Sequence, residues 1–147
     1  MITLALILQA DARQLTGHQA TNLIRMTDKT DLRPHLDLPA LAATTPEEQF
    51  QNQILRPILK LQNELYLALF ADYTLRHNKD FPKATPAQKR NFVTDSLQKD
   101  AALKNTFIGI TIGMLTTQEL EVYLQHSRNY NRRITTMIAE RIVSQLQ

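Results

Sequence analysis

The chain has 147 residues, of which 43% are hydrophobic, and this is enough apolar material for one folded domain. Its net charge of +3 and its 21% of charged residues exclude a wholly disordered chain, since disordered chains combine few apolar residues with high net charge. The absence of cysteine excludes disulfides and thiolate zinc sites and favours a reducing compartment, and the three glycines argue against a turn-rich all-β domain.

The first 44 residues show little periodicity, and we interpret them as a less regular N-terminal extension of a single domain over 1–147. The apolar run Ile2–Leu8 is short for a signal peptide, and no Lys or Arg precedes it. We therefore expect a short helix or edge strand there. No apolar stretch approaches the ~20 residues of a membrane span, so we predict no membrane association and a cytoplasmic location.

A strong helix start lies at Thr45, where Pro46 suits the first helical position and Glu48 completes a capping box. Apolar residues then recur every three or four positions as far as Leu69, which predicts a long core-facing helix over about 46–78. Pro57 interrupts this pattern. Because proline removes a backbone hydrogen bond and clashes one turn back, we expect a kink near 52–57.

Shorter helices are predicted between 79 and 115, after Pro82 ends the first long helix and Thr85 begins another. The apolar, β-branched stretch 105–115 also suits a strand, but we favour a buried helix because only Ile2–Leu8 offers a partner strand.

A second long helix is predicted over about 117–146, because Thr116 and Glu119 fit a capping box and an apolar stripe follows them. The predicted fold is therefore all-α: a helical bundle built on two long amphipathic helices that pack antiparallel, with shorter helices between them and an irregular N-terminal segment.

Several groups of residues from Thr45 onward carry a resemblance: 46–52 and 55–63, Gly109 and Gly113, Thr116, Glu119 and Tyr123, and Arg132, Arg133, Glu140 and Arg141. At these residues the sequence resembles a family of small bacterial proteins, mostly without established function. The resemblance implies a shared helical fold and supplies no active site. Some members bear a glyoxalase label, yet the paired β-rich modules and His/Glu metal ligands of such enzymes are absent from this sequence.

No catalytic residue, metal ion or cofactor is predicted. The four histidines show neither an HExxH motif nor a pair four residues apart, and no phosphate-binding loop is present. One candidate small-ligand pocket lies between the long helices, with a possible role for a histidine as general base. A half-buried helix face explains the same pattern better. The candidate pocket residues are Glu64, Glu119, Tyr123 and His126.

A candidate nucleic-acid-binding cluster consists of Arg128, Arg132 and Arg133, since arginine contacts phosphates and base edges. The surplus of basic residues in 79–105, six against three acidic ones, favours the same class. A solvated or ion-paired helix face is the favoured alternative for this cluster.

Without a catalytic pattern, the wide apolar stripes favour a non-enzymatic protein-interaction or self-associating module. The expected partner is a second copy of the chain or another protein. Nucleic-acid binding is the first alternative, and a small-ligand binder or enzyme with a site between the long helices is the second. Gly109 and Gly113 allow close helix packing, within one subunit or across a dimer.

Overall fold

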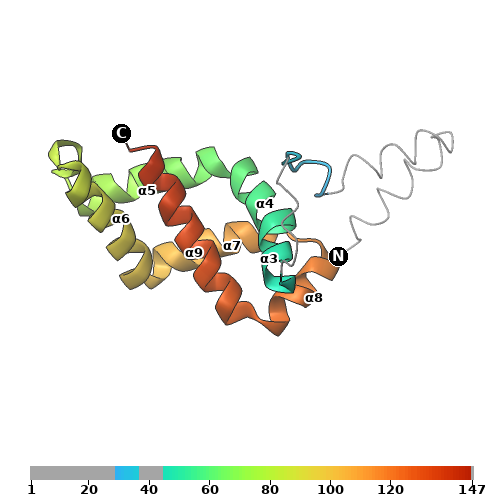
Figure 1. Cartoon of the computed structure of the whole chain (residues 1–147). Coiled ribbons are helices and arrows are strands. Elements are labelled where there is room, and N and C mark those ends of the chain that lie inside the picture. The colour runs from blue at the N-terminus through green and yellow to red at the C-terminus, as the bar shows by residue number, and fades with distance from the viewer. Residues whose placement is uncertain (1–28, 37–44, 147) are drawn as a thin grey trace, which may run out of the picture. The chain divides into compact units, whose positions relative to one another are not determined.

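The computed structural model describes residues 29–36 and 45–146 (Figure 1). The chain divides into two compact units, 1–32 and 33–147, so the boundary precedes the end of the N-terminal extension predicted over 1–44. Of the first unit, only the turn at 29–32 is described. The apolar run Ile2–Leu8 lies outside the described residues.

The described part of the second unit is helical and contains no strand, which confirms the predicted fold class. The stretch 105–115 lies mostly in a helix, as preferred over a strand. The elements are α3 (Pro46–Phe50), the π-helix η1 (Gln51–Leu55), α4 (Arg56–Leu61), α5 (Asn63–His77), the 3-10 helix η2 (Phe81–Lys83), α6 (Pro86–Lys99), α7 (Ala101–Gly113), α8 (Thr117–Gln125) and α9 (Ser127–Ser144).

The helix starts follow from side chains that cap the backbone. At Thr45, Thr85 and Thr116 the hydroxyl oxygen accepts a hydrogen bond from the backbone N–H three residues later. The side chain at that third position, a Glu or a Gln, accepts a hydrogen bond from the N–H of the threonine. The capping boxes predicted at Thr45 and Thr116 are therefore confirmed.

The irregularity expected around Pro57 is present as the π-helix η1. The backbone N–H of Arg56 donates to the carbonyl of Gln51, five residues earlier, so one turn is wider than an α-helical turn. Pro57 has no N–H to donate, and its ring would crowd the carbonyl of Gln53 in a regular helix. The wider turn relieves that crowding and keeps Pro57 buried in the core.

The core lies where two long helical paths meet α7. The first path runs from α3 to α5 (46–77), and the second is α9 (127–144). Tyr66 on α5 packs edge-on against Phe107 on α7, with 5.5 Å between the ring centroids. Its hydroxyl forms a 2.9 Å hydrogen bond with the hydroxyl of Thr111, so its polar end is satisfied inside the core. Other fully buried side chains come from η1, α4, α6 and α9: Leu55, Ile58, Leu59, Val93, Leu97, Ile134, Ile138 and Ile142.

The two long helical paths run in the same direction, so the antiparallel packing expected from the sequence is wrong. Phe50 at the start of the first path contacts Tyr130 near the start of α9, with ring centroids 4.5 Å apart. The helix expected over 46–78 is divided at Gln62, whose φ of −90° and ψ of 8° are not helical. Just after this break, Asn63 accepts a 2.9 Å hydrogen bond from the side chain of Gln145, which follows the end of α9. The return crossing is made by α7, which brings the chain back before α9 begins (Figure 1).

The helix expected over 117–146 is divided at His126, whose φ of −136° and ψ of 35° are not helical. Across this break the hydroxyl of Tyr123 donates to the side chain of Asn131. In a straight helix, eight residues span about 12 Å along the axis, too far for this hydrogen bond. The break also lets both Tyr123 and Tyr130 be buried and stack on each other.

Candidate functional site

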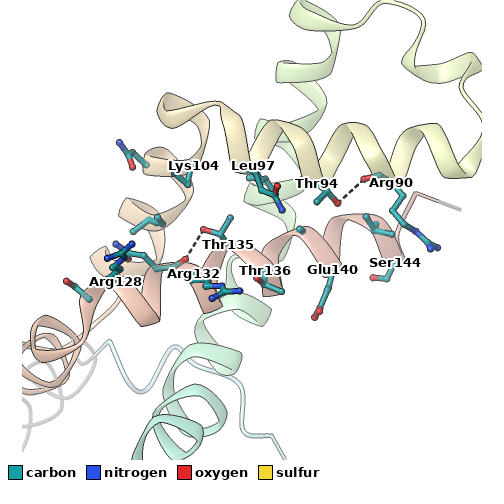
Figure 2. A pocket seen from close by; sticks show the side chains of 17 residues that line it. Arg90, Thr94, Leu97, Lys104, Arg128, Arg132, Thr135, Thr136, Glu140 and Ser144 are labelled. Carbon is teal, nitrogen blue, oxygen red and sulfur yellow. Dashed lines mark hydrogen bonds between the residues drawn. The ribbon is translucent and has the colours of Figure 1, made fainter.

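An elongated groove of about 1140 Å³ lies between α6, α7 and α9 (Figure 2). We call it the α6–α9 groove. It is lined by 17 residues: Arg90, Thr94, Leu97, Gln98, Lys104, Asn105, Ile108, Ser127, Arg128, Asn131, Arg132, Thr135, Thr136, Ala139, Glu140, Val143 and Ser144.

The groove follows α9 from end to end, because its lining begins at Ser127 and continues to Ser144. At 1.5 Å per residue, this distance is about 25 Å. The opposite wall comes from one face of α6, where Arg90, Thr94 and Leu97 are spaced by four and three residues. The helical spacing of the lining residues on α6 and on α9 therefore places them on two facing walls.

The bottom of the groove is apolar. Leu97 and Ile108 belong to the buried core, and Ala139 and Val143 are half-buried against it. Leu97 and Ile108 are already shielded from water, so Ala139 and Val143 offer a partner the apolar surface that gains from removal of water.

Threonines give the walls small, fixed side chains. The hydroxyl of Thr94 donates to the carbonyl of Arg90 at 3.1 Å, and that of Thr135 donates to the carbonyl of Asn131 at 2.8 Å (Figure 2). Because each hydroxyl hydrogen is used locally, the oxygen faces a ligand as an acceptor only.

Positive charge dominates the groove. Arg90, Lys104, Arg128 and Arg132 line it, and the only acidic side chain of the lining is Glu140. Within residues 29–36 and 45–146, none of these four cationic side chains forms an ion pair or a side-chain hydrogen bond. Their donors are therefore available to an anionic partner.

The structure brings together two basic features that the sequence showed separately. Arg128 and Arg132, from the candidate nucleic-acid cluster, share the groove with Arg90 and Lys104 from the basic stretch 79–105. Arg133 does not belong to it, because its guanidinium donates to the side chain of Gln51 in η1.

Four polar groove residues were missed by the sequence reasoning, because Thr94, Gln98, Asn105 and Thr135 match no motif. The signal for Thr94, Gln98 and Thr135 is that polar residues recur at helical spacing beside the apolar stripes of α6 and α9.

The four residues of the candidate small-ligand pocket are not gathered around the groove. Glu64 is exposed on α5 and accepts a 3.0 Å hydrogen bond from Asn63, and His126 is exposed at the junction of α8 and α9. Tyr123 is buried, with its hydroxyl bound to Asn131. The break at His126 gives α8 and α9 different directions. The continuous helix face expected from Glu119 past His126 is therefore interrupted there.

Glu119 is held in a part-buried ion pair that no sequence pattern predicted. The guanidinium of Arg33 donates to both carboxylate oxygens of Glu119, at 2.6 and 2.7 Å, and to the carbonyl of Met114 at 2.6 Å. The exposed fractions of the Arg33 and Glu119 side chains are 7% and 15%. Burial alone would raise the pKa of Glu119, but the hydrogen bonds from Arg33 and Thr116 and the charge of Arg33 together lower it. Glu119 is thus a charged structural group.

The described residues contain no group of three or more His, Asp or Glu side chains placed to hold a metal ion. None of the described helices is both long enough and apolar enough to cross a membrane.

Comparisons with protein families, curated proteins and solved structures find no match to this chain. The resemblance to a family of small bacterial proteins therefore stays a prediction, and the groove has to be interpreted from its own chemistry.

Proposed function

We propose that this protein is a non-enzymatic, cytoplasmic interaction module that binds a polypeptide segment of a partner protein in the α6–α9 groove. One observation carries the proposal: the groove combines the full length of α9 with an apolar bottom and unpaired cationic walls. A length of about 25 Å exceeds a compact metabolite but matches a helix of about 17 residues or an extended segment of about seven.

The chemistry of the lining favours a polypeptide over a nucleic acid. Within 29–36 and 45–146 no aromatic side chain lines the groove, whereas proteins that bind single strands usually stack bases on aromatic rings. Duplex DNA is read by an element that projects into its grooves, and this surface is concave. The buried apolar bottom suits the apolar face of an amphipathic helix, which is a common mode of peptide recognition.

The lining also favours binding over catalysis. Among the described residues it contains hydroxyl groups but no histidine, and Glu140 is their only carboxylate in the lining. These residues therefore supply no pair of a nucleophile and a base. The absence of cysteine favours the cytoplasmic location.

The proposal is tested by selecting binders from a displayed library of random 16-residue peptides. The bait is the full chain, compared with Thr136→Trp, which places a large side chain in the groove from an exposed helix position. Thr106→Trp is the matched control, because Thr106 is an exposed helical threonine outside the groove lining. We expect peptides that bind the wild type and Thr106→Trp and bind Thr136→Trp at least about tenfold more weakly, a loss of about 1.4 kcal/mol.

Equal binding to all three proteins, or no enriched peptide, would overturn the proposal. Binding of single-stranded RNA can be measured by fluorescence anisotropy. If Thr136→Trp weakens the binding of RNA but of no peptide, the groove is assigned to nucleic acid. Oligomers in light scattering that Thr136→Trp dissociates and Thr106→Trp does not would identify the partner as a second copy of this chain.

A further inference from the structure

The charge of the α6–α9 groove is unevenly distributed along its length. Figure 2 shows Lys104, Arg128 and Arg132 on one side of Leu97, at the end where α9 begins. Arg90 and Glu140, of opposite charge, lie toward the other end. One end thus carries three positive charges and the other end is balanced.

From this asymmetry we infer that the groove binds an amphipathic helix whose acidic residues cluster at one end. The inference rests on the proposed function and specifies the partner's chemistry. The apolar face of such a helix would cover the half-buried side chains of Ala139 and Val143, with anchors repeating every three or four residues. Its Asp and Glu side chains would then face Lys104, Arg128 and Arg132.

Charge complementarity supports acidic residues at this end in particular. The guanidinium groups of Arg128 and Arg132 can each bind a carboxylate through two parallel hydrogen bonds. Neither group, nor the Lys104 ammonium, has an ion-pair partner elsewhere in 29–36 or 45–146, so no internal contact must be broken. A carboxylate there also relieves the repulsion among three like charges that share a groove.

The same balance argues against acids along the whole helix. Glu140 would repel a carboxylate placed beside it, and it partly cancels the attraction of Arg90. Uncharged polar or basic side chains suit the Glu140 end. The expected recognition pattern is therefore directional, with an acidic half and a neutral half.

The test adds two charge-reversal variants to the peptide selection. Arg128→Glu with Arg132→Glu inverts the cationic end. Arg56→Glu with Lys60→Glu is the matched control, since these two exposed residues of α4 have the same four-residue spacing and lie outside the groove. Both double variants change the net charge equally, so a general charge effect would move both.

We expect the wild type and the α4 control to enrich amphipathic peptides with Asp and Glu in one half. The groove variant should bind those peptides at least about tenfold more weakly, a loss of about 1.4 kcal/mol, and enrich Lys and Arg in that half instead. Affinity should fall with added salt in the wild type and the α4 control.

Two outcomes would overturn the inference while leaving the proposed function in place. One is a set of peptides that bind Thr136→Trp more weakly than the wild type but carry no acidic half. The other is an acidic preference that both double variants lose equally. Failure of the proposed function is distinct from both, because then no peptide would depend on Thr136.

Discussion

The part-buried ion pair of Arg33 and Glu119 connects segments that are far apart in the sequence. They are separated by 86 positions, yet Arg33 joins the carboxylate of Glu119 to the carbonyl of Met114. Glu119 in turn accepts the N–H of Thr116 and so caps α8. A single side chain from the N-terminal segment therefore stabilises the junction between α7 and α8.

This pair predicts a pH dependence of stability. The pKa of Glu119 is lowered from 4.5, so its ionised form stabilises the fold fully above the unfolded pKa, and this contribution is lost as the pH falls through the lowered folded pKa. We expect Glu119→Gln to reduce the free energy of unfolding by about 2 kcal/mol at pH 7, where charged hydrogen bonds are lost. Urea unfolding measures this free energy. The difference in stability between Glu119→Gln and the wild type should shrink below about pH 4.5.

Asp95 provides the control, because its pair with Lys99 is exposed and such pairs contribute little. Asp95→Asn should change stability far less than Glu119→Gln at pH 7. A Glu119→Gln effect that is the same at pH 7 and pH 3 would contradict the assignment.

At the scale of the elements, helix starts are set by threonine caps that differ in their surroundings. The caps at Thr45 and Thr85 are exposed, with partners only in their own first turn. The cap at Thr116 is part-buried, and its partner Glu119 is also the partner of Arg33. Loss of this third cap therefore affects a local and a long-range contact together.

We expect the three caps to rank accordingly in urea unfolding. Thr45→Ala and Thr85→Ala should each cost about 1 kcal/mol, and Thr116→Ala about 2 kcal/mol, the upper end of the range for caps. Thr116→Ser retains the accepting hydroxyl and should recover most of the loss. Equal costs for all three alanine variants, or no recovery by serine, would argue against the coupling of Thr116 to the ion pair.

For the whole molecule, the second unit contains a hydrophobic core of its own. Every buried apolar side chain of the described residues lies between Phe50 and Ile142, on the helices from α3 to α9 or, for Leu115, in the connection between α7 and α8. The division of the chain falls just before Arg33, so this residue belongs to the unit that it stabilises.

Two truncated chains test this organisation by thermal unfolding followed by circular dichroism. We expect 33–147 to fold and melt cooperatively, because it retains the core and the Arg33–Glu119 pair. The chain 45–147 lacks Arg33 and should be less stable by about 2 kcal/mol, since Glu119 loses its charged hydrogen bonds. Failure of 33–147 to fold would show that the first 32 residues complete the core.

The sequence by itself determined the features that depend on neighbouring residues. The caps at Thr45 and Thr116, the distortion before Pro57 and the helical character of 105–115 arise from contacts within about one helical turn or from short-range periodicity. Residue types also identified Arg128 and Arg132 as a candidate cluster, although a solvated or ion-paired helix face was the favoured interpretation. Those interactions depend on residues that are close in the sequence, so they can be predicted without knowing which distant segments pack together.

Only the tertiary structure decided which distant segments meet. The parallel run of the two long helical paths, the break at His126 and the Arg33–Glu119 pair depend on packing between residues far apart in the chain. The α6–α9 groove has the same origin, because its charge pattern exists only once α6, α7 and α9 pack around a common core. Periodicity shows which residues share a helix face, but the free energy of packing decides which faces of different helices contact each other.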